Sequence, residues 1–572
     1  MAYDAGLPKD RSGQHARAKK WRDRSNACFL IQQRFLPLWQ AQAEIFYPEM
    51  ATFQTEQPDP TTIYDGLFTS KPQVLSRTLG ERIGSMTRAK GEPWFKLTAQ
   101  PEELMELDDV KWWCEDATKR QRNVLYAATS GFAVAMGLAD RDYATFGNAV
   151  TRYAYNKDRS GIYFSAVHLR DCAWAENAEG IIDEMHEKMR PTLAQVRDMF
   201  GIDNLPAEWR KKLDDPKLIH EKVDIRRSVG PLDDLSYGEK EKPRLKAKFV
   251  SCYMACGADI KDDECCLAEG FLDSFPYSVR RWMRLPGEVY ARSPAMGIAL
   301  ADGRTLNIAE MALLKGIELK VSPPRVAIDD TVSGIRLEAD GITFISADYD
   351  QRTGDPIQTL EVGDPSYGMD FVDRKASELA KACFMDLLQM PDREMTLGEF
   401  RQRFKNALRD AAPVFEPIEA DYAQLMDGVF DLCLNAMGPA RPWGVFLEAP
   451  EALSPDNGAQ VRYEFQTALS EAFTELARQE ALDVMAQAQL LKDMESDALD
   501  QIDMDQVTRD SLGNFKAKWT RPEKDVAKLR EARNQAQEEA QAKEDAMAVA
   551  ATASKTNPEN LRMLKTEMEG AA

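Results

Sequence analysis

Apolar residues recur along most of this chain at either the helical or the strand period, and the balance between the two changes near residue 293. Before that point, helical and β-favouring runs alternate, the helical ones at 65–88, 110–150 and 192–213 and the β-favouring ones at 161–180, 244–258 and 264–284. Gly131, Gly137 and Gly147 are possible bends within the long helical run. Thr192 can cap the third helix and Gly201 can end it. The first half of the chain therefore predicts a mixed body of helices and strands.

From residue 293 the pattern predicts one long helix. Ser293 is a candidate cap, Pro294 suits the first helical position, and Pro323-Pro324 stops the run. A helix over 293–322 would be about 40 Å long at ~1.5 Å per residue. Short β-favouring runs then alternate with Gly, Asp and Pro (ITFIS at 342–346 and IQTLEV at 357–362), which is typical of a small β-rich module.

Helical spacing resumes at Met369 and continues through most of the remaining chain. One apolar face is expected from residues spaced four, three, four and four apart: Val372, Ala376, Leu379, Cys383 and Leu387. Thr396 and Glu399 match a capping box, and Pro413 and Pro417 predict a kink in the helix that follows. Residues 461–514 are expected to be helical again. The last ~50 residues, rich in Ala, Gln, Glu and Lys, suit a solvated helix or a partly disordered tail. Two helices that leave a body, carry a small domain and return would form a stalk with a head.

Composition limits the classes of protein that this chain can belong to. Its 572 residues are enough for several domains, 44% of them are apolar, and no stretch approaches ~18 uninterrupted apolar residues. The first thirty residues are basic and polar and lack the apolar segment of a secretory signal, so we expect a cytoplasm-like compartment of synthesis. Nine dispersed cysteines indicate reduced thiols. The net charge of −21 opposes tight binding of nucleic acid, although it is compatible with DNA that slides past without adhering.

Motifs of enzymatic chemistry are missing from the sequence. It has no Walker-type phosphate loop, and His186-Glu187 meets Arg190 where a zinc-binding helix motif needs a second histidine. The sharpest candidate metal site is the cluster of Cys252, Cys256, Cys265 and Cys266, whose spacing departs from the usual C-x₂-C pairs. Small buried hydrophobes are the preferred interpretation of these cysteines. We therefore expect no catalytic residue, no metal and no cofactor.

Several segments, in the same order along the chain, resemble the head-to-tail connector (portal) proteins of podovirus-type bacteriophages. The main one is RRWMRLPGEVYARSPAMGIALADGRTLN at 280–307. The supporting ones are EPWFKL, DYATFGNAV, AQVRDMFG, GFLDSFPYS and EMTLGEFRQRF, so that the resemblance extends from about residue 60 to about residue 500. Three positions depart from the family pattern: Ala291 replaces a glycine, Asn148 replaces a threonine, and Leu397-Gly398 replaces a more helix-prone pair.

The resemblance implies an α+β, mainly helical portal fold with a wing, stem helices, a small β-rich clip and a helical crown. Its expected divisions are: wing 1–292, first stem helix 293–322, clip 323–367, second stem helix 368–390, tunnel loop 391–395, kinked wing helix 396–438, crown 439–520, and tail 521–572.

The implied function is structural rather than enzymatic. Twelve subunits would form a ring at one capsid vertex of the virion, through which double-stranded DNA passes during packaging and ejection, with no sequence specificity and no membrane. A ring of twelve would carry a formal charge of −252 (12 × −21), which disfavours adhesion of phosphate. The implied partners are other copies of the chain, the major capsid protein and scaffold, the terminase and a tail adaptor.

Candidate site residues follow from this assignment. For the DNA channel and tunnel loop they are Arg393, Glu394, Lys381 and Arg401. For docking of partners on the clip they are Arg325, Asp329, Asp330, Asp348 and Arg352. Two alternatives stay open: another acidic ring-forming tail or adaptor protein, and a cytoplasmic metal-dependent enzyme that uses the Cys252–Cys266 cluster.

Overall fold

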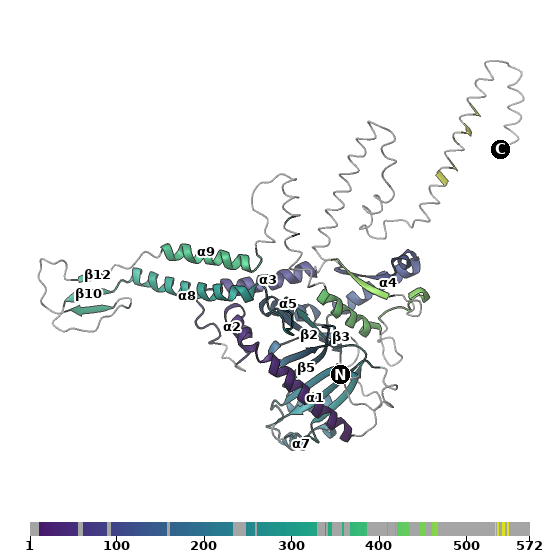
Figure 1. Ribbon diagram of the computed structural model, residues 1–572, viewed down its shortest axis with the longest axis horizontal. Coiled ribbons are helices and arrows are strands. Elements are labelled where there is room, and N and C mark those ends of the chain that lie inside the picture. Colours follow the sequence, from purple (N-terminus) through teal and green to yellow (C-terminus); the bar gives the residue numbers. More distant parts are fainter. Residues whose placement is uncertain are drawn as a thin grey trace, which may run out of the picture. The chain divides into compact units, whose positions relative to one another are not determined.

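The structure is a computed structural model (Figure 1), and it divides into two compact units, Met1–Phe473 and Thr474–Ala572. It describes residues 11–54, 61–88, 93–156, 161–232, 247–257, 260–328, 338, 341–345, 357–359, 366–385, 406, 409, 418, 420–434, 445–453, 460–466 and nine positions between 532 and 547. The described residues of the second unit are helical and exposed, which agrees with a solvated helix in the tail. All labelled helices and strands belong to the first unit.

The sheet with the most strands among the described residues is five-stranded and antiparallel, in the order β4-β5-β6-β7-β8. Its strands are β4 (Cys172–Glu176), β5 (Ile182–Met189), β6 (Asp224–Pro231), β7 (Phe249–Cys256) and β8 (Cys266–Leu272). Helix α1 (Arg11–Gln32) crosses one face (Figure 1), and the ion pair of Arg17 with Glu269, at 2.7 and 2.9 Å, fixes it there. Helices α6 (Leu193–Phe200) and α7 (Ala207–Leu213) contribute to the core on the other face.

Strand β7 shows why this sheet has two apolar faces. Cys252 and Met254 share a core cluster with Trp21 of α1, whereas Tyr253 and Ala255, one residue out of phase, share a cluster with α6 and α7. Successive strand residues point to opposite faces, so a strand covered on both sides has no polar alternation. The predicted strands at 244–258 and 264–284 are confirmed by β7, β8 and β9 (Tyr277–Arg281).

The predicted helix over 110–150 was wrong, because that stretch is two helices and the beginning of a strand. Helix α4 (Asp108–Leu125) ends before Gly131, α5 (Phe132–Phe146) ends at Gly147, and β2 (Asn148–Tyr155) follows at once. Gly131 and Gly147 have φ angles of 64° and 74°, in the left-handed region that glycine enters without steric cost. β2 pairs with β3 (Ile162–Val167) and with β9 in a three-stranded sheet.

A second correction concerns residues 461–465, which were expected to begin a helix. They belong to β13 (Gln460–Phe465), which pairs with β1 (Phe95–Gln100) in antiparallel register, Phe95 opposite Phe465. The Phe465 ring stacks on Trp94 with 6.3 Å between centroids. Residues 439–444, 454–459 and 467–520 of the predicted crown lie outside the described residues.

Other helix signals in the body were read correctly. The hydroxyl of Thr192 accepts from the backbone N–H of Gln195, whose side chain bonds back in a capping box, and Gly201 ends α6. Helix α3 (Lys71–Thr87) lies within the run predicted at 65–88, and α2 (Leu36–Phe46) packs beside it. Short 3₁₀ helices are η1 (Pro48–Met50), η2 (Glu102–Glu106), η3 (Leu169–Asp171), η4 (Ile202–Asn204) and η9 (Glu451–Leu453).

Two helices leave and rejoin this body, and they lie side by side in Figure 1. Helix α8 (Met296–Val321) leads to β10 (Arg325–Ile328), and α9 (Ser366–Ala382) returns. Between them β10 pairs in parallel with β11 (Ile342–Ile345) and antiparallel with β12 (Ile357–Thr359). The predicted helix, β module and helix are thus confirmed in order, although β10 was missed as a strand. Helix α9 ends earlier than expected, because Phe384 has a φ of 58°, and Leu387 lies outside the described residues.

The described residues therefore combine helices with mainly antiparallel sheets, which is an α+β arrangement. None of their helices is long and apolar enough to cross a bilayer. Of the range predicted as a kinked helix, residues 406, 409, 418 and 420–434 are helical, while Thr396, Glu399, Pro413 and Pro417 fall outside the description.

Candidate functional site

The backbone that leads into α8 is clamped to the body by residues of the α5–β2 junction. The Asn148 side chain donates from Nδ2 to the Ala291 carbonyl at 2.7 Å and accepts from the Ala291 N–H at 2.9 Å. A side chain on Gly147 would place its Cβ 2.2 Å from the carbonyl carbon of Arg292. The two segments therefore pass in direct contact. Asn148 and Ala291, two of the three departures from the family pattern, are hydrogen-bonded to each other.

Ser293 joins this clamp to the first turn of α8. Its buried hydroxyl donates to the Ala144 carbonyl at 2.6 Å and accepts from the Met296 N–H at 3.0 Å. The N-cap residue of α8 is Ala295, which makes no side-chain cap bond, so the predicted N-cap at Ser293 was wrong, although its hydroxyl still bonds the N–H of the first helical residue. That first residue is Met296, so Pro294 precedes the helix instead of opening it.

The R-R-W segment that precedes the clamp is a buried polar anchor for the body. The Arg280 guanidinium, 1% exposed, donates to the Asp140 carboxylate at 2.7 Å, and Arg88 pairs with the same carboxylate. Tyr422 receives a hydrogen bond from Arg280 at 3.3 Å. One buried carboxylate thus joins α3, α5, β9 and the helical residues near 422. Two buried cations around it would be costly without it.

Aromatic packing fixes the rest of this segment. The Trp282 ring stacks on Tyr143 with 5.1 Å between centroids and 12° between planes. Tyr290 is fully buried and lies 4.3 Å from Trp174 and 5.6 Å from Trp39, measured between ring centroids. Aromatic pairs at these distances add to the gain from burial alone. The stretch 280–293 is therefore a rigid base from which α8 extends.

The first half of α8 is packed on the body and the second half is not. Met296, Ala299, Gly303 and Leu306 are buried. A Cβ on Gly303 would lie 2.9 Å from Cγ2 of Ile45 and 3.3 Å from Cζ of Phe46, so α2 approaches the bare backbone of α8 there. Beyond Leu306 the described residues of α8 are partly or fully exposed.

Contacts along the pair hold α9 against α8. The Lys375 ammonium lies 3.2 Å from Asp302 of α8 and 2.7 Å from Glu378 of α9. Its hydrogen bonds to Glu378 and Asp302 raise the pKa of Lys375 above its usual value. Farther out, a Cβ on Gly368 would lie 3.0 Å from Cδ1 of Leu313, so the helices are close there too.

The end of α9 returns to the body. Val372, Leu379 and Cys383 are buried, as the predicted apolar face requires, and Ala376 is half-buried. Arg82 of α3 donates to the Met385 carbonyl at 3.2 Å. The pair is therefore held at both of its body ends.

An apolar stripe remains uncovered along α8. Its members follow the helical spacing of three and four residues and are all exposed: Ile298, Ala301, Thr305, Ile308 and Ala312. Ile298 is 73% exposed and Ile308 is 61% exposed. A row of exposed β-branched and small side chains on one helix face is typical of a surface that another helix covers. We call these five residues the α8 stripe.

Helix α9 exposes mainly charged side chains instead, together with Tyr367 and Met369 in its first turn. Its exposed residues include Asp370, Asp373, Arg374, Glu378 and Lys381. Lys381, a predicted channel residue, lies in the last turn of α9 at the body end. Arg325, a predicted docking residue, is exposed at the start of β10, beyond the far end of α8. The structure therefore places these two candidates at opposite ends of the pair and does not bring them together.

The other predicted site residues cannot be placed. Those that lie outside the described residues are Arg393, Glu394, Arg401, Asp329, Asp330, Asp348 and Arg352.

The cysteine cluster has an apolar environment. Cys252, Cys265 and Cys266 belong to the core cluster under α1, and burial raises the pKa of the Cys265 thiol to about 11. All nine cysteines are free. Within the part of the chain that is described, no group of three or more His, Cys, Asp or Glu side chains could hold a metal ion.

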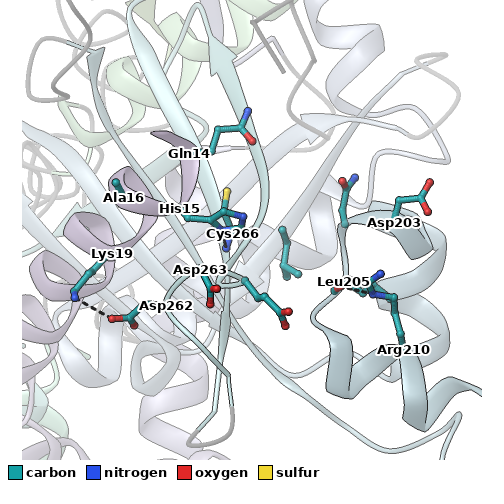
Figure 2. A pocket seen from close by; sticks show the side chains of 13 residues that line it. Gln14, His15, Ala16, Lys19, Asp203, Leu205, Arg210, Asp262, Asp263 and Cys266 are labelled. Atoms are coloured by element: carbon teal, nitrogen blue, oxygen red, sulfur yellow. Dashed lines mark hydrogen bonds and ion pairs between the residues drawn. The ribbon is translucent and has the colours of Figure 1, made fainter. Parts of the chain in front are cut away.

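A polar pocket of about 620 Å³ lies next to that cluster, between α1 and the η4–α7 segment (Figure 2). Its wall mixes charges of both signs: Lys19 pairs with Asp262 at 2.9 Å, and Arg210 and Asp203 line the opposite side. The Cys266 backbone N–H donates to Nδ1 of His15 at 3.1 Å. Arg210 donates from Nε to the Leu205 carbonyl at 2.9 Å, so several of the polar groups that line the pocket already have partners within the chain.

Sequence reasoning missed the α8 stripe and the Asp140 network. The stripe could have been found, because Ile298, Thr305 and Ile308 follow the helical repeat within a helix that was predicted. Nothing in the local pattern signals that Asp140 meets Arg88 and Arg280, since those partners are 52 and 140 residues away.

Comparison with known proteins gives a consistent set of relatives. The family described as bacteriophage head to tail connecting protein matches residues 19–516. A probable portal protein of Bordetella phage BPP-1 is 24% identical over 451 residues, which cover 77% of this chain and 76% of the relative. A portal protein of Salmonella phage epsilon15 is 22% identical over 455 residues, with coverages of 78% and 77%.

Solved structures of gene transfer agent particles also match. A chain of the native virion aligns with a TM-score of 0.34 and 10% identity, over 76% of this chain and 91% of the other. A chain from the neck of an empty particle aligns with a TM-score of 0.33 and 9% identity, over 76% and 90%.

Proposed function

The chain belongs to the bacteriophage head to tail connecting proteins, and from this premise we propose that it is the portal subunit of a phage. Copies of it close into a ring at one vertex of the capsid, and double-stranded DNA passes through the ring during packaging and ejection. The names of two relatives, each aligned over more than three quarters of this chain, support the assignment. Its role is structural: the chain supplies a conduit and docking surfaces in the virion.

The parts of the fold take the following roles in this proposal. The body is the wing, α8 and α9 are the stem helices, β10, β11 and β12 belong to the clip, and residues 391–395 are the tunnel loop. Because β13 pairs with β1 of the body, residues 460–465 belong to the wing, and the crown comprises the chain that follows them.

The observation that carries the proposal is the α8 stripe. Ile298 and Ile308 are more than half exposed in the single chain, and a large apolar residue left in water forgoes roughly 1.5–3 kcal/mol of burial. In a cyclic ring the stripe of each copy is covered by a different face of the next copy, so every stripe is buried once the ring closes. Ala301 and Ala312, spaced along the same face, allow a neighbouring element to approach closely. We propose that the ring contains twelve subunits, the number that the resemblance to portal proteins implies.

The charge of the chain suits a conduit that must not retain its cargo. Each subunit carries −21, and the exposed charges named on α9 are three acidic and two basic. Phosphate is repelled by such a surface, while a few cations keep the duplex centred. Lys381, with Arg393, Glu394 and Arg401 of the following segment, is assigned to the channel.

The clip is assigned to the outward end, where the terminase docks during packaging and the tail adaptor docks later. Arg325, with Asp329, Asp330, Asp348 and Arg352, supplies its charged contacts. The wing is assigned to contacts with the major capsid protein and scaffold. Deletion of 325–364 should leave ring-forming protein that recruits neither terminase nor adaptor in a pull-down assay; recruitment equal to that of the intact chain would contradict this assignment.

Electron microscopy of the purified full chain tests the central claim. Rings of about twelve subunits with a hole wide enough for duplex DNA are expected. Ile298→Asp should abolish them, because it places a charge within the buried stripe. Ile181→Asp is the matched control, since Ile181 is 50% exposed but lies on the β4–β5 turn. Wild-type protein that stays monomeric at high concentration would refute the ring.

A further inference from the structure

A small pocket lies against α8 at the level of Asn307. Its volume is about 270 Å³, its walls include Ile45, Ile63 and Leu67, and Glu44 and Asp65 stand among its lining residues. Both carboxylates are exposed in the single chain. Pockets for small molecules are usually ~300–1,000 Å³, so this one is of a size for a side chain. We call it the Asn307 pocket.

Hydrogen bonds fix the 64–68 turn, which forms one wall of the pocket. Nδ2 of Asn307 donates to the Gly66 carbonyl at 2.8 Å, and Oδ1 of Asn307 accepts from the Phe68 N–H at 2.7 Å. Gly66 has a φ of 82°, so the turn has a conformation that other residues rarely adopt. Tyr64 donates to Glu49 at 3.2 Å. The 64–68 turn is therefore tied to α8 at one point and to η1 at another.

We propose that the Asn307 pocket receives α8 of a second copy of this chain, with Ile308 of that copy entering the apolar wall and Arg304 meeting Glu44 and Asp65. This rests on the proposed ring and specifies which two faces of adjacent subunits meet. Arg304 and Ile308 are both exposed, and they are four residues apart on α8. Side chains at that spacing project from the same face of a helix, one turn apart.

The two surfaces are complementary in polarity and in charge. The α8 stripe is apolar, with Arg304 and Lys315 beside it, both exposed. The pocket combines apolar lining residues with the carboxylates of Glu44 and Asp65, and Tyr64 and Phe68 next to it are 54% and 43% exposed. An apolar contact surrounded by opposite charges is the usual anatomy of a specific interface.

Ring geometry brings these surfaces to the same height. A rotation about the ring axis moves each residue around the axis without moving it along the axis. A residue of one copy therefore meets residues of the next copy at nearly its own level. Asn307 lies between Arg304 and Ile308 within about one helical turn, ~5 Å. The pocket and the side chains that would enter it are thus at nearly one level of α8.

Charge-reversal variants distinguish a contact between neighbouring copies from a contact within one chain. Arg304→Glu should be repelled by Glu44 and Asp65 of the copy on one side, and Asp65→Lys should be repelled by Arg304 of the copy on the other side. Each variant alone should lose about tenfold in the fraction that sediments as rings at low salt, because like charges at an interface oppose association. Thermal unfolding of each variant, followed by circular dichroism, should match that of the wild type, since both residues are exposed.

An equimolar mixture of the two variants is the decisive measurement. With alternating subunits, one interface would bring together the two reversed charges, and the next would bring together the unchanged Arg304 and Asp65. Opposite charges then meet at every interface, so the mixture should form rings that neither variant forms alone. The double variant R304E/D65K should also recover rings. Matched reversals on α4, Lys119→Glu and Glu115→Lys, change exposed charges far from the pocket and should leave ring formation unchanged.

The outcomes separate this inference from the function on which it rests. If the wild-type protein and both single variants form rings in equal abundance, the inference is overturned and the portal function stands. If the single variants form no rings and their equimolar mixture forms none either, the inference is also overturned. Wild-type protein that forms no rings would refute the proposed function itself.

Discussion

Replacement of Gly303 by alanine should weaken the attachment of α8 to the body, although alanine is the better helix former. Alanine favours a helix interior over glycine by ~1 kcal/mol. At Gly303 the added Cβ would meet Cγ2 of Ile45 at 2.9 Å and Cζ of Phe46 at 3.3 Å. Phe46 is fully buried, and Cγ2 is fixed to the Cβ of a branched side chain, so neither atom can move aside freely.

Gly316 on the same helix provides the matched control, because nothing lies within 4 Å of a Cβ built there. Gly316→Ala should therefore stabilise the helix by ~1 kcal/mol. Gly303→Ala gains the same stabilisation from helix propensity but loses ~1–3 kcal/mol to overpacking. The difference between the two variants, about 1–3 kcal/mol, isolates the packing term.

Urea titrations followed by circular dichroism, at a protein concentration where the chain is monomeric, give both free energies of unfolding. A third variant tests the contact itself: Ile45→Ala should cost less in the Gly303→Ala background than in the wild type, because it removes the clashing atom. If Gly303→Ala is as stabilising as Gly316→Ala, the close approach of α2 to α8 at this residue is wrong.

Three further changes test the base from which α8 extends and helix α5, which contains Asp140 and Asp142. Asp140→Asn should cost about 3–5 kcal/mol in unfolding free energy, because it leaves the buried cations Arg88 and Arg280 uncompensated; a loss below ~1 kcal/mol in a urea titration would contradict the network. Asn148→Ala should cost roughly 2–3 kcal/mol, since it leaves the buried backbone N–H and C=O of Ala291 without their partners; an unchanged urea midpoint would mean that this clamp contributes nothing. Burial raises the pKa of Asp142 to about 7, so the folded state retains a proton that the unfolded state releases, and stability should fall as pH rises from about 4 to about 7. Asp142→Asn should remove up to about 4 kcal/mol of this change in unfolding free energy. If the urea midpoints of both proteins change equally with pH, Asp142 is not the source of the dependence.

The correct predictions came from signals that are local in sequence. The cap at Thr192, the break at Pro323-Pro324 and the apolar face of α9 each depend on residues within a few turns. The failures have local causes as well. Alternation over V-R-Y-E-F at 461–465 indicates a strand, but that signal was overridden by the helical composition that follows. Gly131 and Gly147 were treated as bends within one helix, whereas both stand at ends of helices.

By itself, the sequence determined the order of helix, β module and helix after residue 293, the acidic charge, and the family through a collinear set of short motifs. These depend on the periodicity and the identity of neighbouring residues, which the chain carries without being folded. Only the tertiary structure decided that Asp140 neutralises two arginines, that β13 completes a sheet with β1, and that the Asn307 pocket lies beside the α8 stripe. Each of these depends on residues that are tens to hundreds of positions apart. The sequence has no local signal for a partner that folding alone brings within contact distance.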